Sequence, residues 1–283
     1  MTNGSTWHLK GGRPLRLDPF CIMGVLNVTP DSFYDGGRYF DPGLAVEHAR
    51  VMLQEGASII DIGGESTRPF SDRVQAEEEI DRIIPVLEQV LHHVPEAVLS
   101  VDTFKAAVAQ KALDSGALIV NDVSACRFDP ELADVLASYQ PGYVLMHSQG
   151  RPEEMQQSPS YDDVVGEILT FFEGRLDRLT RSGLSEDRIV LDPGIGFGKL
   201  LEHNLDILRH IDRFFSLGRP VLIGLSNKSM WGKLLGVGPE ERQNATQVAT
   251  ALMAAKGVRL HRVHEVDLAW QSLTVVARTE QQA

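Results

Sequence analysis

Short apolar runs alternate with amphipathic stretches along the whole chain, and this alternation limits most strongly how the chain can fold. The apolar runs have the length of strands and lie at 20–26, 57–62, 97–101, 118–123, 143–146, 189–191, 220–225 and 259–263. The stretches between them have the apolar spacing of helices and lie at 43–55, 74–92, 105–115, 130–138, 161–182, 202–215, 239–256 and 266–278. Such alternation is typical of an α/β fold with a parallel sheet.

Eight strand–helix units predict a single closed (β/α)8 barrel, the TIM barrel, with parallel strands. The strands are continuously apolar, as expected for strands that are buried on both faces. The alternative is an open doubly wound sheet, which usually carries Gly-x-Gly-x-x-Gly after its first strand, whereas this chain has Asn27-Val28-Thr29-Pro30-Asp31. We therefore predict one domain over 1–283, with a short N-terminal extension at 1–18.

Composition excludes several classes of protein. The net charge of −12 argues against a nucleic-acid-binding surface, so an anion site has to be a local basic pocket. Neither Cys21 nor Cys126 has the spacing of a metal site, and we expect both to be buried reduced thiols. No stretch approaches the roughly 20 apolar residues of a membrane span. We expect a cytoplasmic protein with no membrane contact.

Polar side chains stand at the ends of the apolar runs. In a barrel, the carboxyl ends of the strands form the active face, so each of these residues is a candidate for the site. They are Asn27, Asp61, Thr67, Arg68, Asp102, Asn121, His147, Gln149, Asp192, Ser226, Lys228, Arg262 and His264.

Four of these residues suit a flat heterocycle that carries amino, ring N–H and carbonyl groups. Asp102 and Asp192 are acceptors, Asn121 both donates and accepts, and Lys228 donates. The alternative for Asp102 and Asn121 is helix capping, because each precedes a helix-like stretch. Taken together, the four predict a heterocycle-binding subsite.

A second group suits a phosphate or diphosphate. Arg68, Arg262 and His264 supply two guanidinium groups and an imidazole, and Asn27 offers an amide oxygen to a divalent metal. Strand alternation directs Arg262 and His264 to the same side. The alternative for Arg262 is a surface ion pair or a side chain that reaches solvent along the protein surface.

Three loops complete the predicted mouth of the barrel. The glycine-rich loop 192–199 lacks the ending of a phosphate loop, so its glycines are expected to permit close approach to a planar ligand, with Phe197 either stacking on that ligand or packing internally. The loops 28–37 and 66–73 have the length or composition of lids, with Phe33 and Phe70 as their apolar contacts.

Ordered motifs along nearly the whole chain resemble those of the dihydropteroate synthase family, the pterin-binding TIM-barrel enzymes. They include Met23-Gly24-Val25-Leu26-Asn27, the segment 61–69, Ser100-Val101-Asp102-Thr103 and Asn121-Asp122-Val123-Ser124. Further motifs are Met146-His147, the loop 192–199, Gly224-Leu225-Ser226 and Arg262-Val263-His264.

The resemblance implies a cytoplasmic transferase that makes 7,8-dihydropteroate and diphosphate from 6-hydroxymethyl-7,8-dihydropterin diphosphate and p-aminobenzoate. It implies Mg²⁺ as cofactor, with Asn27 as the metal ligand, a homodimer, and sulfonamides as inhibitors. It further implies catalytic roles for Arg68, Asp102, Lys228, Arg262 and His264. The pterin contacts are Asp102, Asn121, Met146, Asp192, Phe197, Gly224 and Lys228; the diphosphate contacts are Asn27, Arg68, Arg262 and His264; the p-aminobenzoate contacts are Phe33, Thr67, Pro69 and Ser226.

Two positions depart from the family pattern. Asn227 stands where the family usually has arginine, and Phe70-Ser71 stands where Gly-Ala is common. These departures support an alternative, a pterin-binding paralogue that is non-catalytic or altered in specificity. A pterin-binding methyltransferase domain is a third possibility, but such a domain has no use for a diphosphate cluster.

Overall fold

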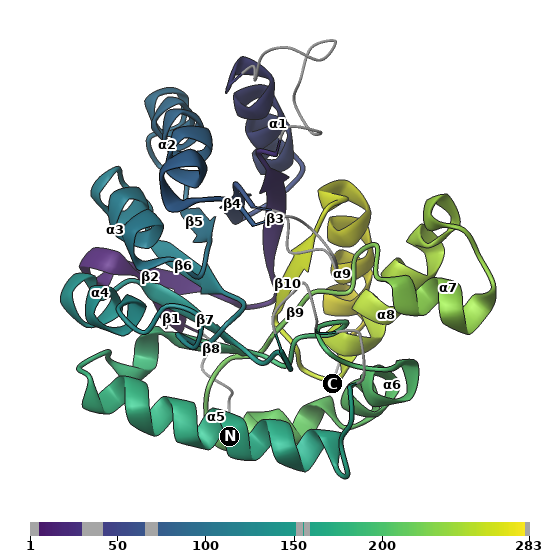
Figure 1. The fold of residues 1–283 in the computed structure, drawn as a ribbon. Helices are drawn as coiled ribbons and strands as arrows, with labels where there is room; N and C mark the ends of the chain where they lie inside the picture. The colour runs from purple at the N-terminus through teal and green to yellow at the C-terminus, as the bar shows by residue number, and fades with distance from the viewer. Residues whose placement is uncertain (1–5, 30–41, 66–72, 151–154, 156–158, 281–283) are drawn as a thin grey trace.

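The strands of this computed structural model form a parallel barrel ringed by helices (Figure 1). The structure describes residues 6–29, 42–65, 73–150, 155 and 159–280. Within these residues the barrel strands are β3 Cys21–Asn27, β4 Ile59–Gly63, β5 Leu99–Asp102, β6 Ile119–Asp122, β7 Gly142–Met146, β8 Ile189–Asp192, β9 Leu222–Ile223 and β10 Leu260–Val263. Their order in the sheet is β8-β7-β6-β5-β4-β3-β10-β9.

A single bridge closes the ring. Leu191 of β8 pairs in parallel with Val221, and the Leu191 N–H donates to the Pro220 carbonyl at 2.9 Å. The doubly wound alternative is therefore wrong, since an open sheet has two free edges. The predicted (β/α)8 barrel is confirmed.

Most helices begin and end within a few residues of the predicted bounds. They are α1 Pro42–Gln54, α2 Ala76–His93, α3 Ala106–Asp114, α4 Leu132–Tyr139, α5 Val164–Arg181, α6 Leu201–Arg209, α7 Ser229–Leu235, α8 Gln243–Ala255 and α9 Val266–Glu280. Two predicted helices begin or end as 3₁₀ turns instead, at Ile211–Leu217 after α6 and Pro239–Glu241 before α8. The sequence analysis did not predict α7, which stands out from the ring in Figure 1.

The amino-terminal extension forms an antiparallel hairpin of β1 Thr6–His8 and β2 Pro14–Arg16. Its Trp7 and Leu9 are fully buried in one cluster with Cys21, Met23 and Ile59, which belong to the barrel interior. The Trp7 indole N–H donates to the Arg188 carbonyl at 2.7 Å. The hairpin therefore closes the end of the barrel at which the strands begin.

The barrel interior changes from apolar to polar along the strands. The lower layers contain Met23, Ile59 and Val144, all in the interior cluster, whereas Asp102 and Asp192 stand at the carboxyl ends of β5 and β8. Alternate residues of each strand face inward, so one face of a strand supplies both the core and the site. The outward faces pack against the helices in a separate, larger cluster.

Both cysteines are buried and free, as predicted. Burial raises the pKa of the Cys21 thiol to about 12, so this thiol stays protonated. In the part of the chain that the structure describes, no helix is long and apolar enough to cross a membrane.

Replacement of Trp7 by alanine tests the role of the hairpin. We expect Trp7→Ala to lower the free energy of unfolding by about 3–5 kcal/mol, because it leaves a cavity at the closed end of the barrel. Urea denaturation measures this loss. The control is Trp270→Ala, since Trp270 is 43% exposed and its loss should cost clearly less. Equal losses would contradict the plug role of Trp7.

Candidate functional site

A pocket opens at the carboxyl ends of the strands, where a barrel places its site. Its lining comes from strands β5 to β8 and β10 and from the segments after β6, β8 and β9. The lining residues are Asp102, Asn121, Val123, Met146, Asp192, Ile195, Phe197, Gly224, Lys228 and Arg262. All seven residues that the sequence analysis assigned to the heterocycle lie among them.

Arg262 lies at the centre of the site, between two carboxylates from different strands. Its Nε donates to Asp61 Oδ2 at 2.7 Å and its Nη2 donates to Asp102 Oδ2 at 2.6 Å. Burial alone lowers the pKa of Arg262, but Asp61 and Asp102 outweigh burial and raise it overall. The alternative of a surface ion pair is wrong, because the two partner side chains are only 0% and 8% exposed.

Asp102, at the end of β5, has a carboxyl group with a shifted pKa. Burial raises its pKa to about 7, although the Arg262 guanidinium opposes this change. The capping alternative is wrong for Asp102, because the first N–H of α3, that of Ala106, is bound by Asp129 Oδ2 at 2.7 Å. Asn121 is also no cap, since the next helix, α4, begins only at Leu132 and has Glu131 at its N-cap position; the Asn121 Nδ2 instead donates to Asp61 Oδ2 at 2.9 Å.

Asp192 and Lys228 form the opposite wall of the pocket. Burial raises the pKa of Asp192 and lowers the pKa of Lys228 to about 8, while each charge opposes the effect of burial on the other. The Lys228 ammonium lies 4.5 Å from the centre of the Phe197 ring, within the range of a cation–π contact. Phe197 also lines the pocket.

The buried amine of Lys199 ties the loops after β7 and β8 together. Its Nζ lies 3.0 Å from His147 Nδ1 and donates to the carbonyls of Gly194 at 2.9 Å and Phe197 at 3.0 Å. Burial lowers the pKa of Lys199 to about 7 and that of His147 to about 2, so His147 stays neutral and accepts at Nδ1.

Two glycines of the loop 192–199 serve this junction rather than a ligand. A Cβ on Gly194 would lie 1.9 Å from the His147 carbonyl oxygen, and one on Gly198 would lie 2.5 Å from the Gln149 carbonyl oxygen. Both glycines also have positive φ angles, which disfavour other residues. The expectation that these glycines permit approach of a planar ligand is therefore wrong for Gly194 and Gly198.

The second predicted group lies beside the first, and one of its members, Arg262, also lines the heterocycle pocket. Ser226 and His264 come from the ends of β9 and β10, and Ser226 Oγ lies 3.0 Å from His264 Nδ1. Asn27 Oδ1 and Asp102 Oδ2 each lie 3.8 Å from the position of a Cβ on Gly63, which places the amide near the pocket. Arg262 therefore joins the two predicted subsites instead of belonging to one.

Several predicted residues fall elsewhere. Phe33, Phe70 and the segment 67–69, which contains Thr67, Arg68 and Pro69, lie outside the described residues, as do most of both predicted lids. Gln149 is half-buried and exchanges hydrogen bonds with the backbone of Ser160, and it is not among the residues that line the pocket.

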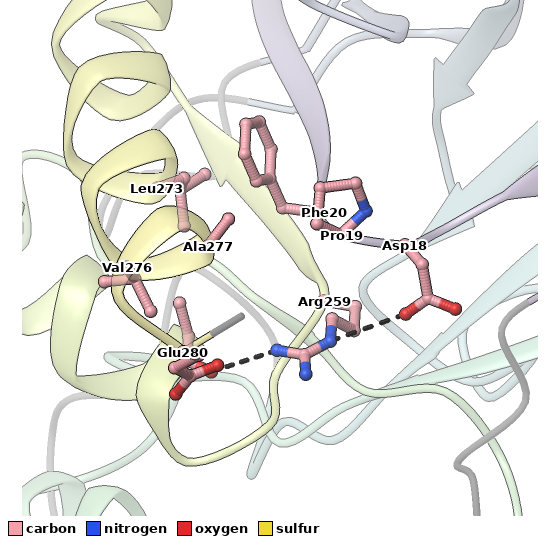
Figure 2. A pocket seen from close by; sticks show the side chains of 9 residues that line it. Asp18, Pro19, Phe20, Arg259, Leu273, Val276, Ala277 and Glu280 are labelled. Atoms are coloured by element: carbon pink, nitrogen blue, oxygen red, sulfur yellow. Dashed lines mark hydrogen bonds and ion pairs between the residues drawn. The ribbon is translucent and has the colours of Figure 1, made fainter. Parts of the chain in front are cut away.

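A larger cavity, about 320 Å³, lies at the opposite end of the barrel (Figure 2). Arg259 points into it beside Asp18, at 3.6 Å from Nε to Oδ1, and the rest of the lining is mostly apolar, including Phe20 and Leu273. This cavity borders the starts of β3 and β10, away from the polar layer. Because its lining is mostly apolar and lies away from the polar strand ends, we do not assign the active site to this cavity.

Two residues of the site have roles that sequence reasoning missed. Asp61 was recognised as a strand-end residue but received no role, and Lys199 was considered only as the end of a loop motif. The continuous apolar run around Asp61 contained one signal, since a carboxylate inside a buried strand needs a cationic partner. Nothing in the sequence indicated which cation that is.

Comparison with known proteins identifies the class to which this site belongs. The profile of the family described as "Pterin binding enzyme" matches residues 23–264. Dihydropteroate synthase of Escherichia coli K12 is 41% identical over 268 residues, which cover 95% of this chain and 94% of that protein. The chain is therefore a pterin-binding enzyme of the TIM-barrel type.

Solved structures narrow the class to one family. Yersinia pestis dihydropteroate synthase, solved with a sulfonamide drug, has a TM-score of 0.90 at 40% identity, covering 96% of this chain and 98% of its own. The Xanthomonas albilineans enzyme, solved with 7,8-dihydropteroate, has a TM-score of 0.86 at 40% identity, covering 97% and 99%. This chain belongs to the dihydropteroate synthase family.

Replacement of Lys199 by methionine tests the junction between the two loops. We expect Lys199→Met to lower the free energy of unfolding by about 1–3 kcal/mol, because buried acceptors lose their donor. Hydrogen exchange at the amides of 194–198 should also become faster. The control is Lys256→Met, because Lys256 also donates to two carbonyls but at the protein surface. Unchanged exchange in Lys199→Met would contradict the role of the amine.

Proposed function

We propose that this chain condenses 6-hydroxymethyl-7,8-dihydropterin diphosphate with p-aminobenzoate, as a dihydropteroate synthase of folate biosynthesis. The observation that carries the proposal is the convergence of Asp102, Asn121, Asp192, Lys228 and Arg262 on one pocket. These side chains combine acceptors, a donor and a fixed guanidinium, which a pterin linked to an anion requires. The family membership supports the same reaction.

The pterin ring would lie between the two walls of the pocket. Asp102, Asn121 and Asp192 offer acceptors to its amino and ring N–H groups, and Lys228 offers a donor to its carbonyl. Met146, Phe197 and Gly224 also line the pocket and would contact the faces of the heterocycle. The remaining pocket residues, Val123 and Ile195, supply apolar contacts.

The diphosphate would lie beside Arg262 and His264, and Arg68, which lies outside the described residues, is proposed to bind it as well. An arylamine is a weak nucleophile, so the pterin methylene has to become strongly electrophilic before the C–N bond forms. Arg262 and His264 stabilise the negative charge that develops on the diphosphate as the C–O bond breaks. Asp102 stabilises the positive charge shared by the methylene and the ring, and the amine loses its proton after the C–N bond has formed.

Mg²⁺ is part of the proposal as a metal that arrives with the diphosphate. Among the residues that the structure describes, no group of three or more histidine, cysteine or acidic side chains is placed to hold a metal. Mg²⁺ commonly binds through one or two protein oxygens together with substrate phosphates and water, and Asn27 Oδ1 supplies such an oxygen. When bound, the metal would neutralise charge on the leaving diphosphate.

The p-aminobenzoate site would border the diphosphate site at Ser226. The Ser226 hydroxyl contacts His264, so this residue connects the arylamine side of the mouth with the anion side. Thr67, Pro69 and Phe33 are proposed to complete the site. The Yersinia pestis enzyme was solved with a sulfonamide drug, which supports the proposal that this chain also binds sulfonamides.

Diphosphate release tests the proposed function. Purified protein with pterin diphosphate, p-aminobenzoate and Mg²⁺ should release diphosphate and form 7,8-dihydropteroate. If the protein binds the pterin without turnover, the proposed activity is wrong and the non-catalytic paralogue is correct. Asn227 favours that alternative, and restoration of turnover by Asn227→Arg would support it.

The pH dependence of the reaction follows from two pKa changes. Burial raises the pKa of Asp102 to about 7 and lowers that of Lys228 to about 8. Binding requires an ionised Asp102 and a protonated Lys228, so kcat/KM for the pterin diphosphate should fall below pH 7 and above pH 8. Steady-state rates across this range measure the profile.

The control for the alkaline side is Lys228→Arg, which keeps its charge at high pH. We expect this variant to react more slowly than the wild type at all pH values. Its rate should not fall further over the alkaline range in which Lys228 of the wild type loses its proton. A wild-type profile that is flat from pH about 6 to 9 would contradict the assignment of these two groups.

We further propose that the whole chain acts as one domain in a cytoplasmic homodimer. Exposed apolar side chains on α8 and α9, including Val248 at 54%, Leu252 at 56% and Val275 at 64%, support a contact between copies there. The two helices pack against each other and present a joint surface. Sedimentation velocity over a range of concentrations tests the dimer.

A further inference from the structure

Asp61 is a fully buried carboxylate beneath the site and contacts two proposed substrate-binding residues. It lies in the middle of β4, and its side chain is 0% exposed. Its Oδ2 accepts hydrogen bonds from Arg262 Nε at 2.7 Å and from Asn121 Nδ2 at 2.9 Å. The proposed reaction gives Asp61 itself no contact with substrate.

The contact with Asn121 decides which end of that amide faces the pocket. An ionised carboxylate has no hydrogen to donate, so the amide nitrogen of Asn121 has to point to Asp61. The amide oxygen lies on the other arm of the planar group and is directed away from Asp61. Asn121 therefore presents an acceptor to the heterocycle, and a ligand N–H group is its complement.

The contact with Arg262 decides how the guanidinium is oriented. Nε and Nη2 lie along one edge of the planar guanidinium group, and here that edge is divided between Asp61 and Asp102. Nη1 lies on another edge and takes no part in these two bonds. A single buried oxygen of Asp61 therefore orients both Asn121, which faces the proposed heterocycle, and Arg262, which faces the proposed diphosphate.

We propose that Asp61 is a positioning residue that fixes the amide orientation of Asn121 and the guanidinium orientation of Arg262. Through them it selects a heterocycle that offers an N–H donor at Asn121. This inference rests on the proposed pterin function. It adds which residue determines where that site donates and where it accepts hydrogen bonds.

The test uses Asp61→Asn, which keeps the shape of the side chain but removes its charge. An asparagine at this position can itself donate, so Asn121 is no longer held in one orientation. We expect the affinity for pterin diphosphate, measured by calorimetry, to fall about 10-fold or more. The KM for p-aminobenzoate should stay within about twofold, because Asp61 acts on the pterin side.

The matched control is Asp122→Asn in the neighbouring strand β6. Asp122 is also 0% exposed, but it faces outward and accepts from the backbone of Ser124 and Cys126. We expect this variant to lose stability while keeping its affinity for the pterin diphosphate. Equal weakening in Asp122→Asn and Asp61→Asn would overturn the proposal, since both would then act through general destabilisation.

A double-mutant cycle separates positioning from bulk stability. If Asp61 acts through Asn121, then Asp61→Asn and Asn121→Ala should be non-additive in pterin affinity, whereas Asp122→Asn and Asn121→Ala should be additive. Additive effects for the Asp61 pair would overturn the link to Asn121. If Asp61→Asn does not fold, Asp61→Ser replaces it, because the shorter serine hydroxyl can donate as well as accept and so also leaves Asn121 without a fixed acceptor, and the same pattern is expected.

The binding measurement also distinguishes failure of this inference from failure of the proposed function. Wild-type protein that binds the pterin diphosphate without turnover would contradict the proposed reaction, but the Asp61 variants would still report on positioning. Wild-type protein that binds no pterin diphosphate would overturn both. Wild-type affinity in Asp61→Asn, with normal turnover, would overturn only the role of Asp61.

Discussion

The buried guanidinium of Arg262 between Asp61 and Asp102 is the interaction on which the site depends. Three strands that are far apart in the sequence meet through it, because β4, β5 and β10 each contribute one of the charges. Removal of the cation would leave two buried carboxylates unpaired, which is far more costly than the loss of a surface ion pair. The proposed pterin subsite and the proposed diphosphate subsite therefore both depend on the charge of Arg262.

The barrel makes this arrangement possible by separating its stabilising and functional layers. Alternate residues of each strand point inward, so one strand, β4, buries Ile59 in the apolar layer and presents Asp61 in the polar layer. The hairpin around Trp7 closes the lower end and keeps water from the apolar layers. Burial raises the pKa of Asp102, and the low dielectric around it strengthens the charge contacts in the pocket.

Strand ends were predictable from the sequence, whereas side-chain partners were not. Asp102, Asn121 and Asp192 follow long apolar runs, so their convergence follows from the barrel alone. The partner of Arg262 depends on side-chain direction across the barrel, and the contact of Lys199 with His147 depends on how two loops pack. The hairpin was missed because strands of three residues carry too little periodicity, and α7 because its seven residues follow a strand that is itself only two residues long.

A crystal structure of this chain with 6-hydroxymethyl-7,8-dihydropterin diphosphate tests the shared role of Arg262 most directly. We expect the heterocycle between Asp102 and Lys228, with the oxygen of Asn121 toward a ring N–H group and the diphosphate beside Arg262. A diphosphate bound away from Arg262, or a pterin in the cavity beside Arg259, would contradict this arrangement.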